Sequence, residues 1–132
     1  MKKLLLVFIV SLGLTSCFHK TQIHLEFLDE YVIPDSLEYK NSLIGGLSGV
    51  DYANGFYYFV VDDSKKPRYI ITDIEFKKDT ISNIGFVDVV FLNDSTEVFY
   101  KNNALDLESI IVNENTLDIG LVSEGFINGG KN

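Results

Sequence analysis

The sequence predicts an all-β protein built of short antiparallel hairpins, with the general architecture of a sandwich, a barrel or a propeller. The 132 residues are 46% hydrophobic and 13% aromatic, with 10 Phe, 7 Tyr and no Trp. This composition is typical of one packed domain and unlike that of a disordered chain. Beyond residue 24, apolar residues recur with a period of two, which is the spacing of strands and not of helices. Clusters of turn-forming residues divide these apolar runs at intervals typical of short strands.

The expected strands follow from this pattern in chain order. A first strand is expected over residues 25–33, where Pro34 ends the alternation. Further strands are expected at residues 50–52, 56–61, 70–76, 84–92, 97–100, 105–112 and 117–122. The pair Asn54-Gly55 predicts a tight hairpin, because both residues tolerate a positive φ. Polar turns are expected at residues 63–67, 93–95 and 113–116.

Two segments of the chain resemble each other. Residues 47–62 and 107–124 each contain a strand entry with small residues, a hairpin, and a second strand that ends in an acidic residue. Their spacing of about 60 residues fits a long propeller-blade repeat. The sequence pattern therefore predicts antiparallel hairpins of a sandwich, barrel or propeller, and the repeat fits the propeller.

The amino terminus has the features of an export signal. Lys2 and Lys3 precede an apolar run over residues 4–14, which is shorter than the roughly 20 residues of a membrane-spanning helix. The run is typical of a signal peptide. Residues 14–17 (LTSC) resemble the lipobox of bacterial lipoproteins, in which the cysteine is lipidated and the leader is cut before it. We therefore expect a signal peptide over residues 1–16, a lipidated tether over 17–24 and a β domain over 25–132, with the lipid on Cys17. The alternative is an ordinary signal peptide with a chance cysteine.

This leader predicts a lipid-anchored protein of the bacterial cell envelope, facing the periplasm or the cell surface, with no transmembrane helix in the mature chain. Phe18 follows the cysteine in place of the Asp that is associated with retention in the inner membrane, which favours the outer membrane. The net charge of −8 argues against a nucleic-acid partner, because such proteins present a basic face. The single cysteine excludes an intrachain disulfide and a zinc site of several thiolates.

Several short motifs resemble the phytase-like family, which is described as having esterase-like activity of phytase. They are residues 44–52 (IGGLSGVDY), 56–63 (FYYFVVDD), 67–69 (PRY), 106–110 (DLESI) and 123–125 (SEG). The resemblance covers residues 25–127, although Val61 replaces the serine that is usual in the family. It implies a β-propeller in a secreted hydrolase of phosphate or ester substrates. Family members are longer than this chain, and a closed propeller needs at least about four blades. The resemblance therefore implies propeller-like antiparallel hairpins that form an incomplete β-propeller of about two to three blades, as an N-terminal or truncated portion.

The resemblance also directs attention to the acidic residues. Asp106 and Glu108 are two apart on an expected strand and so share one face. Together with Asp62, Asp63 and Glu124 they would surround a hard cation. Calcium is the candidate ion, because it takes six to eight oxygen ligands. Such a cation would polarise a phosphate or ester oxygen. The competing interpretation is a solvated strand edge in which Asp62 and Asp63 cap a turn.

The glycine-rich entry at residues 44–49 offers a second candidate site. Ser48 does not fit the Gly-x-Ser-x-Gly nucleophile motif, because Gly49 comes one position early, and the sequence has no histidine beyond position 24. Gly45, Gly46 and Gly49 are interpreted as backbone positions that need a positive φ or a close approach. Backbone N–H groups there are candidates for contacting an anion, and Arg68 is a candidate for facing a phosphate from the neighbouring loop. The competing interpretation of Arg68 is a solvated turn.

Three hypotheses about function follow. The first is an envelope lipoprotein that hydrolyses a small phosphate or carboxylic ester, with metal assistance. The second is a non-catalytic propeller-type lipoprotein that binds a ligand or a protein. The third is an inactive truncated product. The sequence alone leaves the choice between an enzyme and a binding protein open.

Overall fold

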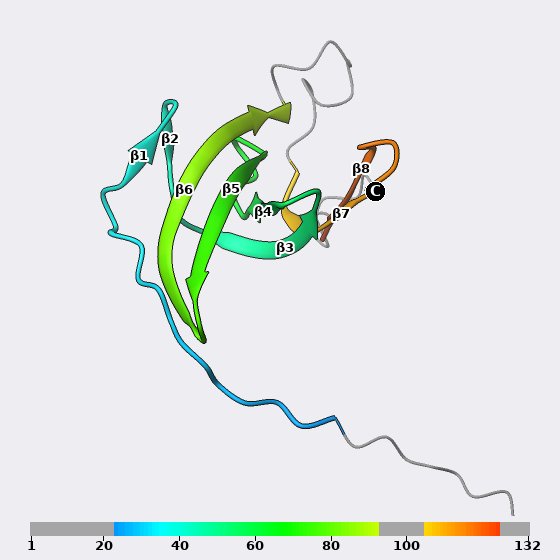
Figure 1. Ribbon diagram of the computed structural model, residues 1–132. Coiled ribbons are helices and arrows are strands. Elements are labelled where there is room, and N and C mark those ends of the chain that lie inside the picture. Colours follow the sequence, from blue (N-terminus) through cyan, green and yellow to red (C-terminus); the bar gives the residue numbers. More distant parts are fainter. Residues whose placement is uncertain (1–22, 93–104, 125–132) are drawn as a thin grey trace, which may run out of the picture.

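The computed structural model describes residues 23–92 and 105–124, and every regular element of these two ranges is a β-strand (Figure 1). The strands are β1 (Glu38–Tyr39), β2 (Ser42–Leu43), β3 (Leu47–Ala53), β4 (Phe56–Val61), β5 (Arg68–Lys77), β6 (Thr80–Phe91), β7 (Leu107–Val112) and β8 (Ile119–Ser123). All of their pairings are antiparallel, which confirms the predicted all-β class. Within the same ranges, no helix has the length and apolar character needed to cross a membrane.

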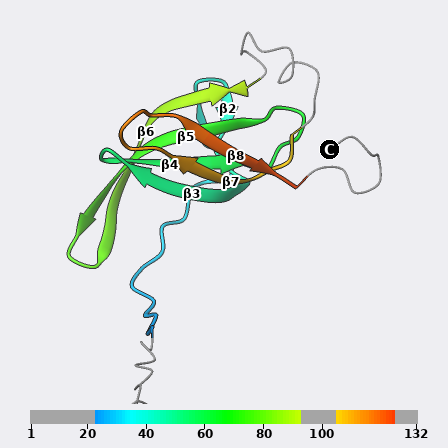
Figure 2. The same ribbon diagram turned by 90° about the vertical axis from the view of Figure 1, so that its right-hand side faces the viewer.

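The strands form three open sheets. The central sheet has the order β3-β4-β5-β6, and β1-β2 and β7-β8 are separate two-stranded sheets. Figures 1 and 2 show β7 and β8 lying across one side of the central sheet, with β1 and β2 on the other side. The sheets do not close into a ring within the described ranges, an arrangement compatible with the predicted incomplete propeller.

Each face of the central sheet is covered by a separate apolar core. The first core lies between this sheet and β7-β8, and its buried members are Ala53, Tyr58, Val60, Leu92, Leu107, Ile110 and Val112. The second core lies on the opposite face, where the segment before β3 covers the sheet. Its buried members are Ile44, Val61, Ile70 and Val89, with Ile33, Leu37 and Tyr39 packed against them. Burial of apolar surface on both faces explains why β4 is a continuous aromatic and β-branched run in the sequence.

Tight turns and bulges set the register of the central sheet. Asn54 and Gly55 connect β3 to β4 with φ values of 50° and 89°, which confirms the predicted two-residue hairpin. In the β5-β6 pair, a register shift between Ile71 and Thr72 leaves Val87 as an extra residue. The bulge reverses the alternation along β6, so that side chains before and after it both contribute to the second core.

The strand predicted over residues 25–33 is wrong. This segment runs past the β5-β6 hairpin without forming a strand (Figure 1). Leu25 and Phe27 are exposed, and Asp29 Oδ2 accepts a hydrogen bond from the Ile81 amide at 2.8 Å. A period-two pattern specifies which side chains could share a face, but a strand also requires a paired neighbour, and none of the described strands pairs with this segment. The strand predicted at 97–100, the turn at 93–95 and Cys17 lie outside the described residues.

The internal repeat predicted from the sequence is present in the structure. The β3-β4 and β7-β8 hairpins each carry a register shift at the second residue of the first strand, one at Ser48 and the other at Glu108. The hairpin ends are also joined in the same way. The Asp62 amide donates to the Gly46 carbonyl at 2.8 Å, and the Glu124 amide donates to the Asp106 carbonyl at 2.9 Å. Positions 46–52 of the first repeat therefore correspond to 106–112 of the second.

Candidate metal centre

Three acidic side chains meet where the two repeats join. Asp62 follows β4, Asp106 precedes β7, and Glu108 occupies the bulge of β7. One carboxylate oxygen from each of the three lies within 4.8 Å of the others. We call these three residues the carboxylate cluster. Asp62 and Glu108 are exposed and Asp106 is partly buried, so the cluster lies at the surface with one side against protein.

Two glycines allow this convergence. Gly46 has a φ of 64°, and its carbonyl accepts the hydrogen bond that holds Asp62 in place. At Gly49, a Cβ would lie 2.6 Å from the Glu108 carbonyl oxygen and 3.0 Å from the Ser109 Cα. Real side chains do not tolerate such contacts, so the absence of a side chain at Gly49 lets β7 approach β3 closely.

Polar side chains of the first repeat then fix β7 against β3. The Ser48 hydroxyl donates to the Leu107 carbonyl at 2.6 Å. Asp51 Oδ2 accepts from the Val112 amide at 2.7 Å, at the other end of β7. These two bonds align the whole of β7, and with it the position of the carboxylate cluster. Because the Ser48 hydroxyl is engaged with the backbone, it serves a structural purpose.

The carboxylate cluster is electrostatically strained. A hydrogen bond with the Asp62 carboxyl group, together with burial and the negative charges of Asp62, Glu108 and Glu124, raises the pKa of Asp106 to about 6. Asp106 Oδ1 is buried and has no hydrogen-bond partner. Repulsion among carboxylates and an unsatisfied buried oxygen both favour a cation at this place. Three carboxylate oxygens are also the ligand type that calcium prefers.

Asp63 and Arg68 lie outside the carboxylate cluster and form an ion pair of their own. The buried Arg68 guanidinium donates to Asp63 Oδ2 at 2.8 Å, Lys66 O at 2.8 Å, Ser42 Oγ at 2.7 Å and Leu43 O at 3.3 Å. Burial opposes ionisation of Asp63, but its hydrogen bond to Arg68 and the amides of the turn outweigh it and hold the pKa of Asp63 below its usual range. Asp63 also accepts from the amides of the 63–66 turn. Both side chains thus brace this turn, and the contact of Arg68 with an anion stays a prediction.

The remaining predicted residues lie around the cluster without forming part of it. Glu124 is bonded to Asp106 through its amide, and its carboxylate contributes charge to the cluster's surroundings. Gly45 has no positive φ, and a Cβ there would contact nothing within 4 Å. Of the five acidic residues proposed from the sequence, the structure therefore brings together Asp62, Asp106 and Glu108.

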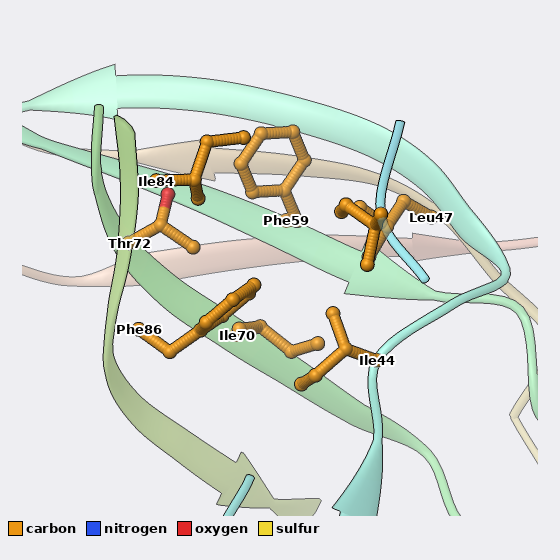
Figure 3. Close-up of a pocket in the computed structure, with 8 residues that line it drawn as sticks. Ile44, Leu47, Phe59, Ile70, Thr72, Ile84 and Phe86 are labelled. Carbon is orange, nitrogen blue, oxygen red and sulfur yellow. The ribbon is translucent and has the colours of Figure 1, made fainter. Parts of the chain in front are cut away.

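An apolar pocket on the second-core side of the central sheet was not predicted from the sequence (Figure 3). It is lined by Ile33, Ile44, Leu47, Phe59, Ile70, Thr72, Ile84 and Phe86. Its free volume of about 20 Å³ has room for one or two water-sized groups. The Thr72 hydroxyl is buried among these apolar side chains and has no hydrogen-bond partner. The one sign of this pocket in the sequence is Thr72, a polar residue in the otherwise apolar alternation of β5.

The fold and the cluster together define an all-β repeat protein with a candidate cation site at the joint between two repeats. The Phytase-like family model, described as "Esterase-like activity of phytase", matches residues 42–126. This match covers more than half of the chain, and the chain therefore belongs to the phytase-like family. The family has a β-propeller fold, with which the open antiparallel sheets are compatible. Searches of curated proteins and of solved structures found no match.

Proposed function

We propose that this chain is a phytase-like hydrolase of phosphate or carboxylic esters that works with a bound calcium ion. The observation that carries the proposal is the carboxylate cluster: three converging acidic side chains with a buried, unpartnered oxygen on Asp106. Membership of a family described by esterase-like activity supports the reaction class. The family alone gives no substrate, so the proposal extends to the ester class and no further.

Asp62, Asp106 and Glu108 would hold the ion. When bound, calcium supplies a positive centre that polarises an ester or phosphate oxygen and neutralises charge that develops on it. Calcium takes six to eight oxygen ligands, so three side chains leave coordination positions for water and substrate. The exposed positions of Asp62 and Glu108 leave the cluster accessible from solvent. Asp106, which is partly buried, anchors the other side.

The test is the hydrolysis of chromogenic phosphate and carboxylic esters by the full chain, with calcium and with a chelator. Glu108→Gln keeps the size of the side chain and removes a ligand charge, and Glu75→Gln is the matched control at an exposed position of β5 outside the carboxylate cluster. We expect calcium-dependent hydrolysis that the control retains and Glu108→Gln loses by about 100-fold, which is the scale of losing a transition-state interaction of about 2.7 kcal/mol. Equal hydrolysis with calcium and with chelator contradicts metal assistance.

A non-catalytic role in binding a ligand or protein is the second candidate. It is favoured by the hydrogen bonds that the Ser48 hydroxyl and the Arg68 guanidinium donate to protein oxygens, which give both groups a structural role. This candidate predicts that calcium stabilises the protein but that no ester is hydrolysed. The same preparation, assayed for both properties, distinguishes the two.

We further propose that the protein is held at the cell envelope by lipid on Cys17, with the outer membrane as the favoured location. The support is the leader and the LTSC motif in the sequence. Several acyl chains anchor a protein firmly without a transmembrane helix. Metabolic labelling with a palmitate analogue should label the wild-type chain and not Cys17→Ser. Equal labelling of both would contradict the proposal.

A further inference from the structure

The internal repeat makes one exposed face of the protein equivalent to a face that is buried elsewhere in the same chain. The β3-β4 hairpin exposes an apolar face opposite the first core, which we call the leading face. It consists of the exposed Leu47, Val50 and Tyr52 and the partly buried Tyr57 and Phe59, at a part of the sheet that the second core leaves incompletely covered. By the two registers, the corresponding residues of the second repeat are Leu107, Ile110, Val112, Ile119 and Leu121. All five of these contribute to the first core.

The contrast in burial is large. The exposed fractions of Val50 and Tyr52 are 55% and 53%, whereas those of the corresponding Ile110 and Val112 are 3% and 8%. Tyr52 and Tyr57 also form an aromatic pair, with ring centroids 4.8 Å apart. Exposed apolar side chains that lie together on one strand, as Leu47, Val50 and Tyr52 do on β3, are typical of a surface that another protein covers.

The β7-β8 hairpin exposes the complementary surface. Its outer side, which we call the trailing face, consists of Ile111, Gly120 and Val122. These residues correspond to Asp51, Tyr58 and Val60, which form the side of the first repeat that β7 covers. Val122 is 59% exposed, whereas Val60 is fully buried. The chain therefore exposes both halves of a contact that it already makes once internally.

We infer that the leading face of one copy of this chain packs on the trailing face of a second copy, in the manner of the internal contact between the two repeats. Val122 of one copy would take the place of Val60 and pack against the leading face of the next. Leu47 and Phe59 form part of that face and also line the apolar pocket below it (Figure 3). Because the two faces differ, the contact is heterologous and can continue from copy to copy.

The repeat also defines how the contact between copies differs from the internal one. Ser109 stands at the position of Gly49, so the two copies cannot approach as closely as β3 and β7 do. Gly46 and Ser48 stand at the positions of Asp106 and Glu108, so the joint between copies lacks the carboxylates of the cluster. The inference therefore does not rest on the proposed function, and calcium binding is not expected at this joint.

Site-specific crosslinking tests the inference. Within the chain, Asp51 Oδ2 and the Val112 amide are 2.7 Å apart, and the corresponding residues between copies are Ile111 and Tyr52. Two differently tagged full-length chains, one with Tyr52→Cys and the other with Ile111→Cys, would be expressed together and treated with a short bis-maleimide. Both residues are exposed, so neither substitution removes core packing. The matched control pairs Ile111→Cys with Glu75→Cys, an exposed position outside both faces.

We expect a crosslinked species with both tags, several-fold more abundant for the Tyr52 and Ile111 pair than for the control pair. Any linking through Cys17 is common to both pairs and sets the background. A chain carrying both substitutions should give a ladder of species larger than a dimer, and adding Val50→Glu should abolish it. A yield no greater than that of the control pair, or linking that stops at a dimer, would overturn the inference.

Discussion

Replacing Gly49 by alanine should separate the two repeats. The new Cβ would meet the Glu108 carbonyl oxygen at 2.6 Å, the Ser109 Cα at 3.0 Å and Val60 Cγ2 at 3.2 Å. Two of these three atoms belong to the β7 backbone, which must therefore move. Overpacking of this kind costs about 1–3 kcal/mol of stability, and each kcal/mol lowers the Tm of a domain of this size by about 4–8 °C. Because Asp106 and Glu108 move with β7, the response to calcium should weaken as well.

Gly45→Ala is the matched control, since a Cβ at Gly45 would have no neighbour within 4 Å. We expect it to change stability by no more than about 0.5 kcal/mol. Thermal unfolding of both variants and of the wild type, with and without calcium, measures both effects. If Gly49→Ala matches Gly45→Ala in stability and in calcium response, close packing of β7 on β3 does not position the carboxylate cluster.

Two further predictions concern charge. Arg68→Met should lower the free energy of unfolding in urea by about 2–3 kcal/mol, because it removes the donor to the buried Ser42 hydroxyl and to the partly buried Asp63 carboxylate. Lys40→Met breaks the exposed 2.8 Å pair with Asp88 and should have little effect. Equal losses would contradict a structural role for Arg68. Because the pKa of Asp106 is raised to about 6, the folded chain holds this proton more tightly than the unfolded chain, so stability without calcium should fall as the pH rises from about 4 to about 6 and then level off. Asp106→Asn should remove that slope in pH-dependent thermal unfolding, and a slope that persists would assign it to another group. The lowered pKa of Asp63 acts in the opposite sense and below this interval, since its contribution to stability is lost as the pH falls below about 4.

The sequence predicted those parts of the fold that local chemistry determines. The bounds of β4 agree with the predicted run at 56–61, and Asn54-Gly55 forms the expected turn, because these features depend on neighbouring residues. The prediction of a strand at residues 25–33 was wrong, because an alternating pattern does not supply a strand to pair with. The bulges at Val87 and Glu108 were not predictable either, since they arise from the packing of one strand against another.

The same distinction applies to the candidate site. The sequence identified Asp106 and Glu108 as neighbours on one face, and the bulge at Glu108 sets how they meet Asp62. The sequence could not show which of Asp62 and Asp63 belongs to the carboxylate cluster. Adjacent residues point in different directions, and the partner of Asp63 is Arg68, whose position depends on the burial of its side chain. The apolar pocket is assembled from several distant segments, so a local pattern can mark one of its residues, Thr72, but not its lining as a whole.

The most direct test of the central claim is calorimetry of the full chain with calcium, magnesium and chelator. A ligand present at one hundred times its Kd stabilises a folded protein by about 2.7 kcal/mol. A carboxylate cluster that holds calcium predicts a clear rise in Tm with millimolar calcium and a smaller rise with magnesium. Glu108→Gln should lose most of the calcium effect, and Glu75→Gln should retain it. The absence of a calcium-specific shift, or an equal shift in Glu108→Gln, would contradict the assignment of Asp62, Asp106 and Glu108 as a metal centre.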